Sequence, residues 1–229
     1  MALLLNLETS TKKCSVCLSN NGKVIAWEEI NEGQFSHAEK LHVFIENVFK
    51  KAKLPMSSLD AIAVSKGPGS YTGLRIGVSA AKGLCFALDK PLIAIDTLEI
   101  LAHAVKVERP CFIVPMLDAR RMEVYSAVFD GQYQKIRETE AEIIHPDSYK
   151  AYLSMGKVLF LGDGAGKCAV MLQHENAVFL TDHFPSAKEM APLSEARFHK
   201  KKFEDVAYFE PYYLKDFIAI KPRDFLAKK

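Results

Sequence analysis

The hydrophobic and polar positions near the start of the chain follow the period of two that β-strands show. Apolar residues form a run at 2–7, alternate with polar ones at 14–18 and return at 23–29. The second and third of these segments are separated by Asn20-Asn21-Gly22, a sequence typical of a tight hairpin turn. Three antiparallel strands are therefore predicted at the start of the chain.

Later apolar positions change to the spacing of α-helices. Apolar side chains recur at helical spacing after Ser36, which predicts a helix that begins in a capping box of Ser36 with Glu39 and ends before Pro55. A strand, a helix, another strand and another helix are predicted next, at 61–65, 71–88, 92–95 and 97–105. This order of elements is similar to that of one half of an actin-like or ribonuclease-H-like protein.

The pattern partly restarts after residue 106, in a less regular form. Strands are predicted at 111–116, 123–129, 132–136 and 157–161, and a helix at 186–202 that contains Pro192. We therefore predict an α/β protein of two actin-like (ribonuclease-H-like) domains, residues 1–105 and 106–229, each a mixed sheet flanked by helices. The final helix is expected to pack back on the first domain.

Composition and charge narrow the class of protein. The 229 residues carry 30 basic and 28 acidic side chains, a net charge of +2, so no strong general field attracts nucleic acid. No segment approaches the roughly 20 apolar residues that span a bilayer, and the short N-terminal apolar run does not have the pattern of a secretory signal. Five cysteines, an odd number, fit a reducing cytoplasm. Cys14 and Cys17 lie three apart on a strand and point to opposite faces, so they are not expected to share a metal ion.

A glycine-rich segment, KGPGSYTGLRIG at 66–77, joins a predicted strand to a predicted helix. Its glycines permit backbone conformations that other residues avoid, and exposed amides at a helix start suit an anion. The segment lacks the spacing of a P-loop. Two interpretations stay open: an anion site, or a turn whose geometry alone requires glycine.

The helix after this segment carries two stripes. Its apolar seam contains Leu74, Val78 and Ala81, and a strip of small residues beside the seam contains Gly73 and Gly77. Because glycine inside a helix costs about 1 kcal/mol relative to alanine, the strip predicts that another backbone passes close by. That backbone belongs either to this domain's own sheet or to a second protein. In the second case a bulky residue at Gly77 is expected to push the two proteins apart.

Several motifs together resemble the TsaB family. They are LNLETST at 5–11, SHAEKL at 36–41, DAIAV at 60–64 followed by GPGSYTGLRIGVSAAKG, DARRMEVY at 118–125 and PYYL at 211–214. They occur in the family's order over nearly the whole chain, which makes the set far more specific than any one glycine loop.

The resemblance implies a role and a set of partners. Proteins of this family pair with a catalytic paralogue, TsaD, and a small ATPase, TsaE, which together transfer a threonylcarbamoyl group to an adenosine of tRNA. The resemblance further implies a homodimer in isolation, contact with tRNA only through the complex, no membrane, and ATP, ADP and metal bound by the partner subunits rather than by this chain. It places the partner interface on the first two helices of the N-terminal domain. The expected interface residues are His37, Leu41, Phe44, Tyr71, Gly73, Leu74, Gly77, Val78 and Ala81.

The resemblance also places an interdomain cleft, where nucleotide chemistry is expected to be weakened. Glu8 stands where the family has an aspartate, and the extra methylene shifts the carboxylate away from a magnesium-bound phosphate. The segment 162–168 fails as a Walker loop, because Leu161 stands at the first glycine position and Cys168 replaces the hydroxyl. The expected cleft residues are Glu8, Thr9, Ser10, Asp118, Arg120 and Arg121.

Three hypotheses about function stay open. The first is a non-catalytic scaffold, since His37 and His42 are five apart and cannot reproduce the metal-binding H-x-x-x-H of the catalytic paralogue. In this hypothesis His37 makes a polar contact at the helix start. The second is an active ATPase, kinase or glycoprotease-like peptidase of the same fold, and the third is a binding module for another protein. For Asp118, Arg120 and Arg121, a solvated surface cluster and a loop that faces the cleft or a partner stand side by side.

Overall fold

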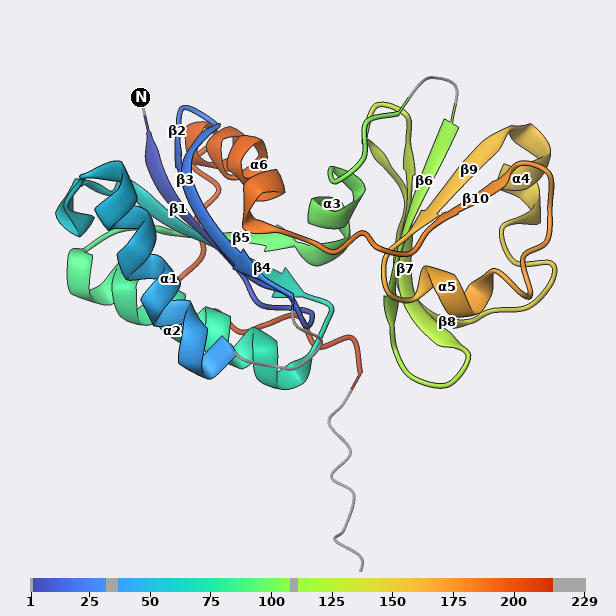
Figure 1. The fold of residues 1–229 in the computed structure, drawn as a ribbon, viewed down its shortest axis with the longest axis horizontal. Helices are drawn as coiled ribbons and strands as arrows, with labels where there is room; N and C mark the ends of the chain where they lie inside the picture. Colours follow the sequence, from blue (N-terminus) through green and yellow to red (C-terminus); the bar gives the residue numbers. More distant parts are fainter. Residues whose placement is uncertain (1, 32–36, 108–110, 216–229) are drawn as a thin grey trace, which may run out of the picture.

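The structure, a computed structural model, describes residues 2–31, 37–107 and 111–215. The strands of the first half build a five-stranded mixed sheet in the order β3-β2-β1-β4-β5 (Figure 1). These strands are Leu3–Glu8 (β1), Cys14–Asn20 (β2), Lys23–Ile30 (β3), Ala61–Gly67 (β4) and Leu92–Asp96 (β5). The helices of this half are His37–Ala52 (α1), Tyr71–Leu88 (α2) and Thr97–Ala102 (α3), with a short 3-10 turn at Met56–Ser58.

The second half builds another five-stranded mixed sheet, in the order β10-β9-β6-β7-β8. Its strands are Cys111–Asp118 (β6), Glu123–Asp130 (β7), Lys135–Ile143 (β8), Lys157–Leu161 (β9) and Ala177–Leu180 (β10). Its helices are Lys150–Met155 (α4), Ala165–Cys168 (α5) and Ala187–His199 (α6). The prediction of an α/β protein with two mixed sheets flanked by helices is confirmed.

The two halves share one topology. In each, three strands pair antiparallel and two further strands add in parallel, so that β1, β2, β3, β4 and β5 correspond to β6, β7, β8, β9 and β10. The element order β-β-β-α-β-α-β-α therefore occurs twice along the chain. The similar element order expected from the sequence is present in full, without a strict sequence repeat.

Alternate residues of β1 supply the two cores of the first half, because successive side chains of a strand point to opposite faces. Leu5 faces α1 and α2 and packs in a cluster with Leu41 and Val78. Leu4 faces the other side and packs in a cluster with Met190 of α6. Figure 1 shows α1 and α2 on one face of this sheet and α6 on the other.

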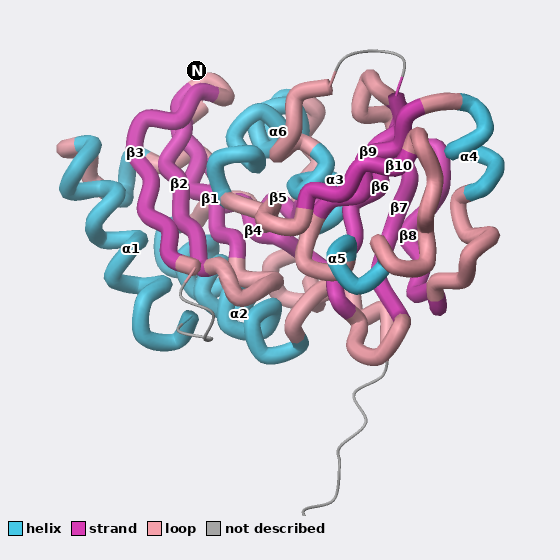
Figure 2. The backbone as a smooth tube through the Cα atoms, turned by 45° about the vertical axis from the view of Figure 1, so that its right-hand side comes forward, coloured by secondary structure: helices cyan, strands magenta, loops and turns pink. Residues whose placement is uncertain are grey.

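The last helix of each half packs on the sheet of the other half. Helix α3 follows the first sheet in the chain, yet its Leu98 and Leu101 join a core cluster with Ile113 and Phe129 of the second sheet. Helix α6 follows the second sheet and packs on the first, as the sequence pattern suggested for the final helix. Figures 1 and 2 both show α3 and α6 between the two sheets. The boundary predicted at residues 105 and 106 stays a prediction.

Some predicted elements differ from the structure. The bounds of the strand expected at 132–136 are wrong, because Tyr133 belongs to a turn closed by its N–H to the Asp130 carbonyl, and β8 begins only at Lys135 and continues to Ile143. The length of β8 escaped prediction because it is an edge strand whose polar side chains leave every second residue exposed. The strand β10 was also missed, and the capping box at Ser36 lies outside the described residues.

No helix in the described part of the chain combines the length and the apolar character that a membrane crossing requires.

Candidate functional site

The end of β1 and the glycine-rich turn between β4 and α2 pack against each other through their main chains. The Ser70 amide donates to the Ser10 carbonyl at 2.7 Å. The Thr9 hydroxyl donates to the Gly73 carbonyl at 2.8 Å. Ser70 also caps α2, since its hydroxyl accepts from the Gly73 amide. The glycine-rich turn is thus a docking surface for residues 9–10 of the same chain.

Three glycines, in this turn and in the first part of α2, lie so close to residues 9–10 that a side chain at their positions would clash. A Cβ atom at Gly73 would lie 2.1 Å from the Thr9 carbonyl oxygen, and one at Gly77 would lie 2.2 Å from the Thr9 hydroxyl. At Gly69 the distance to the Ser10 carbonyl oxygen would be 2.4 Å. The close approach predicted for the strip of small residues is therefore made by the chain's own loop. The hypothesis that Gly73 and Gly77 admit the helix of a second protein is corrected, because this space is already filled.

Glu8 ends β1 and is completely buried. Its Oε1 accepts a hydrogen bond from the Ser10 amide at 2.6 Å. Burial raises the pKa of Glu8 to about 7, and hydrogen bonds from Ser10 and Ser65 and the charge of Lys13 offset only part of the rise. Near neutral pH this side chain is a partly protonated carboxyl group that closes its own loop.

Glu8 is poorly suited to hold a magnesium-bound nucleotide. A magnesium site needs an ionised carboxylate that reaches solvent and ligand, whereas Glu8 is buried and its Oε1 accepts from the Ser10 amide. The Ser70 amide, at the start of α2, is occupied by the Ser10 carbonyl, and the Gly73 amide by the Ser70 hydroxyl. Among the described residues no group of three or more histidine, cysteine, aspartate or glutamate side chains is arranged to hold a metal ion.

His37 begins α1 and makes the polar contact expected of it. Its Nε2 lies 2.7 Å from the Thr11 carbonyl oxygen. Burial lowers the pKa of His37, and the contact with Thr11 offsets part of this change. A neutral imidazole that donates from Nε2 satisfies the contact, so His37 joins the start of α1 to the loop that follows β1.

The predicted cleft residues of the second half lie at the turn between β6 and β7. The Asp118 amide donates to Asp163 Oδ1 at 3.0 Å, and the Asp118 carboxylate pairs with the Lys167 ammonium group. Burial raises the pKa of Asp163. Arg120 and Arg121 form the tip of this turn, with φ of 68° and 52°, and both side chains are exposed. Asp118 is thus part of a surface ion pair, while the two arginines extend from it into solvent.

The structure does not bring the expected interface residues to the surface. Except for the half-exposed Tyr71, they are buried in this chain: His37, Leu41, Phe44, Gly73, Leu74, Gly77, Val78 and Ala81. The outward sides of α1 and α2 carry other apolar residues, with Val43 49% exposed and Phe86 87% exposed. A Cβ atom at Gly83 would meet nothing within 4 Å. Val43, Phe86 and Gly83 could have been found from the sequence, since each interrupts the polar side of an otherwise amphipathic helix.

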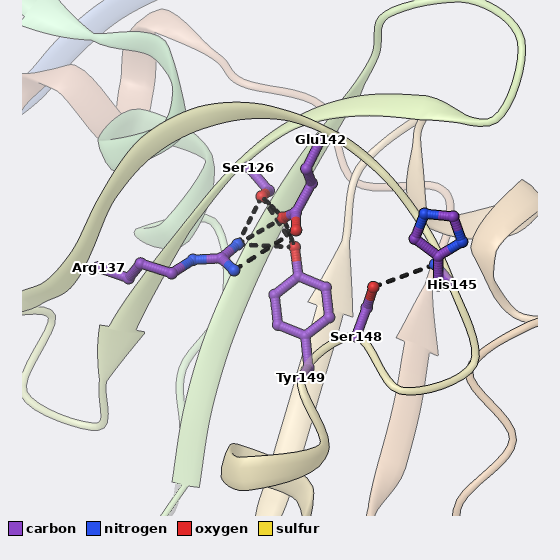
Figure 3. Close-up of polar contacts among 6 residues, drawn as sticks. All are labelled: Ser126, Arg137, Glu142, His145, Ser148 and Tyr149. Carbon is purple, nitrogen blue, oxygen red and sulfur yellow. Dashed lines mark hydrogen bonds and ion pairs between the residues drawn. The ribbon is translucent and has the colours of Figure 1, made fainter.

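One polar cluster was missed by sequence reasoning. The Glu142 carboxylate of β8 contacts Arg137, the Ser126 hydroxyl and the Tyr149 hydroxyl (Figure 3). The guanidinium of Arg137 donates to the Tyr149 oxygen at 2.9 Å and lies 4.6 Å from the centre of that ring. These contacts join strand β7, strand β8 and the start of α4. Within the cluster the four groups bond to one another, and only Arg137 Nε lacks a partner, so the cluster has the character of a structural tie rather than of an open site.

Comparison with known proteins bears on this arrangement. The family model of TsaD, tRNA N6-adenosine threonylcarbamoyltransferase, matches residues 31–221. The protein TsaB of Bacillus subtilis, named for tRNA threonylcarbamoyladenosine biosynthesis, is 32% identical, with 93% of each chain covered. The chain belongs to the TsaB branch of this family. Its assignment agrees with the motifs from LNLETST to PYYL.

Two further comparisons extend the match. TsaB of Escherichia coli is 29% identical over 95% of this chain and 96% of its own length. The solved structure of YeaZ from Pseudomonas aeruginosa superposes with a TM-score of 0.78 at 27% identity and covers 93% of this chain and all (100%) of that one. This TsaB-family chain therefore matches these relatives over more than nine-tenths of its length, and its actin-like fold is shared with YeaZ.

Proposed function

We propose that this chain is a non-catalytic subunit of the assembly that makes threonylcarbamoyladenosine on tRNA. Membership of the TsaB branch supports a role in this modification. One structural observation carries the non-catalytic part: the end of β1, where a nucleotide would bind in an active relative, is closed by contacts of Thr9 and Ser10 with the glycine-rich turn. In this proposal the chain binds no cofactor, and the modification of tRNA takes place in the cytoplasm.

The proposed partners are a TsaD-like transferase and a TsaE-like ATPase. The family model that matches this chain describes the transferase itself, which favours pairing between two similar folds. We place the contact on the outward sides of α1 and α2, where Val43 and Phe86 expose apolar surface and Gly83 leaves space for a neighbour. The same surface would serve a homodimer in isolation. At about 25 cal/mol per Å² of apolar surface, a modest patch supplies several kcal/mol before the costs of association.

The rival hypothesis of an active enzyme finds no suitable cysteine nucleophile among the described residues. All five cysteines are buried, and burial raises the pKa of Cys14, Cys17 and Cys85 to about 12. A thiol that stays protonated is a poor nucleophile. The buried Glu8 argues equally against a kinase or an ATPase.

Reconstitution tests the proposed function. Purified TsaD and TsaE homologues of the same cell, the adenylate substrate and unmodified tRNA are incubated with and without this chain. Formation of threonylcarbamoyladenosine only in the presence of the chain is the expected result, with no ATP hydrolysis by the chain alone. Equal product without the chain, or steady ATP turnover by the chain alone, would contradict the proposal.

The contact surface is tested separately by charge at an exposed valine. Val43→Glu is expected to weaken binding to the TsaD homologue by about tenfold or more, since a buried unpaired carboxylate costs several kcal/mol. Val170→Glu is the matched control, because Val170 is 73% exposed in the second half. Binding is measured by titration calorimetry and folding by circular dichroism. Equal affinity of both variants would place the contact elsewhere.

A further inference from the structure

The C-terminal segment 203–215 forms a strap that runs along the first half and reaches the second. Its Glu204 amide donates to the Leu92 carbonyl at 2.9 Å, which adds it to the edge of β5. Lys82 of α2 donates to the Phe209 carbonyl at 3.0 Å. The Tyr212 amide then donates to the Lys66 carbonyl at 2.7 Å. The strap ends at Lys215, whose ammonium group pairs with Glu123 at the start of β7.

The strap joins cations and aromatic rings into one surface. The ring of Tyr213 lies 4.9 Å from that of Tyr71, whose hydroxyl accepts from Arg75 at 3.0 Å. At the other end Lys215 lies 5.8 Å from the centre of the Tyr125 ring. The Glu123 amide donates to the Arg120 carbonyl at 3.2 Å, so the turn that carries Arg120 lies beside the end of the strap. The strap therefore connects the region of Arg75 with this turn.

The turn between β6 and β7 holds two arginines in a backbone conformation that arginine rarely adopts. Arg120 and Arg121 both have positive φ, where glycine or asparagine is usual. Neither arginine forms an ion pair with a described residue. The nearby carboxylate of Asp118 is occupied by Lys167, and that of Glu123 by Lys215. The turn thus keeps a backbone conformation that arginine rarely adopts, and it presents two exposed arginine side chains to solvent.

We propose that this surface binds the phosphate backbone of RNA. The basic–aromatic belt consists of Arg75, Arg120, Arg121, Tyr212 and Tyr213. Its cations come from two different elements, α2 and the turn between β6 and β7, which suits a polyanion better than a single anion. Tyr212 and Tyr213 are 41% and 37% exposed, so each offers part of a ring face for stacking with an unpaired base. Because the whole chain has a net charge of only +2, binding is expected from these exposed arginines rather than from a general field.

This inference rests on the proposed function and adds the surface by which the chain itself contacts tRNA. The decisive variant is Arg120→Gly with Arg121→Gly, since glycine suits the positive φ of both positions and removes both charges. In either case the variant is expected to be at least as stable as the parent, because glycine relieves the strain of a positive φ. The affinity for RNA separates the two cases: it is unchanged if the arginines do not bind phosphate, and it falls if they do. Arg120→Lys with Arg121→Lys keeps the charge and is expected to keep the affinity.

The experiment measures the affinity of the reconstituted complex for unmodified tRNA transcript over a range of salt concentrations. For the glycine variant we expect about a tenfold loss of affinity and a fall of about two in the slope of log affinity against log salt. The control removes two charges at positions away from the belt, Lys157→Gly with Lys202→Gly. An unchanged slope in the glycine variant, or an equal loss in the control, would overturn the inference.

Two readouts separate this inference from the proposed function. Binding of the variants to the TsaD homologue is measured in parallel, and no change is expected. If the complex with the parent chain modifies tRNA while the glycine variant binds tRNA normally, only the belt is refuted. If the glycine variant instead loses TsaD, the turn is a protein contact and the belt is equally refuted. Failure of the parent chain to support modification refutes the proposed function itself.

Discussion

The two halves of this chain have the same strand order but very different helices. Helices α1 and α2 of the first half contain 16 and 18 residues, whereas α4 and α5, at the corresponding places, contain 6 and 4. Long helices bury an apolar side on their sheet and leave a second side for a partner, while helices of one or two turns can only cover the sheet. In the proposed function, the first half carries the docking layer, and the second half has only short helices at the corresponding places.

Corresponding carboxylates show the same divergence at the level of single residues. Glu8 ends β1 and Asp118 ends β6, the first strands of the two halves. Burial without a paired cation raises the pKa of Glu8 to about 7. Asp118 lies at the surface and is paired with Lys167. One place in the fold can thus hold either a buried carboxyl group that closes a loop or a solvated ion pair.

The largest expected effect compares the inner and outer sides of α2. Gly73→Ala places a Cβ 2.1 Å from the Thr9 carbonyl oxygen, and we expect a loss of about 3 kcal/mol or more in the free energy of unfolding. For the same reason Gly77→Leu is expected to unfold the chain rather than only to separate it from a partner. Gly83→Ala is the control, with an expected gain of about 1 kcal/mol, because nothing lies within 4 Å. Urea denaturation measures all three; equal stability of the two alanine variants would contradict the internal packing of the strip.

The next effect concerns the second half. Glu142→Gln removes the charge that faces Arg137 in the cluster with Ser126 and Tyr149, and we expect a loss of about 2 kcal/mol in the free energy of unfolding at pH 7. Glu140→Gln, at an exposed position of the same strand, is expected to change little. If both variants unfold at the same urea concentration, the cluster contributes no net stability.

A pH-dependent effect is expected from Glu8. Because its pKa is raised from 4.5 to about 7 in the folded chain, its contribution to stability is fully present below pH 4.5 and is lost as the pH rises through 7. Glu8→Gln is therefore expected to make the stability less dependent on pH over this window. The change is on the order of 2 kcal/mol between pH 5 and pH 8. Thermal unfolding at several pH values measures this, and a parallel pH profile for parent and variant would disprove the raised pKa.

The smallest effect is expected at the corresponding ion pair. Lys167→Met removes the partner of Asp118, which is 46% exposed in this pair. Since solvent screens such a pair, the expected loss is below about 1 kcal/mol and shrinks with added salt. A loss in the free energy of unfolding as large as that expected for Gly73→Ala would mean that the ion pair at the end of β6 matters to the fold as much as the packing at the end of β1.

Local pattern sufficed for most of the first half and for the family. The helical recurrence of Leu41, Phe44 and Val48 predicts α1, and the ordered motifs predict the fold with both sheets. Prediction from local pattern failed where the role of a residue depends on neighbours that are distant in the sequence. The contact of Gly73 with Thr9 crosses from α2 to β1, and no sequence period distinguishes it from contact with a second protein. The strand predicted at 132–136 had the wrong bounds, and most of β8 was missed, because an edge strand needs few apolar residues.

The candidate site was predicted only in its chemistry. The sequence led to the expectation that the Glu8 carboxylate is shifted away from a magnesium-bound phosphate, whereas its raised pKa depends on burial that the sequence alone does not give. The ion pair of Lys167 with Asp118 spans two turns that lie far apart in the chain. The strap that ends at Lys215 is recognisable as the PYYL motif, but its course along α2 is a tertiary feature.

Because α3 and α6 each pack on the sheet of the other half, this arrangement has a consequence for folding during synthesis on the ribosome. Strand β1 is synthesised first, but one of its faces is covered by α6, which is among the last elements to emerge. Until then Leu4 and its neighbours face water, or whatever chaperone attends the nascent chain. Contacts so distant in sequence slow folding, because a long loop must close before they form. A truncated product that ends before α6 therefore retains an uncovered apolar sheet face, which makes it a candidate for rapid degradation rather than a half-functional protein.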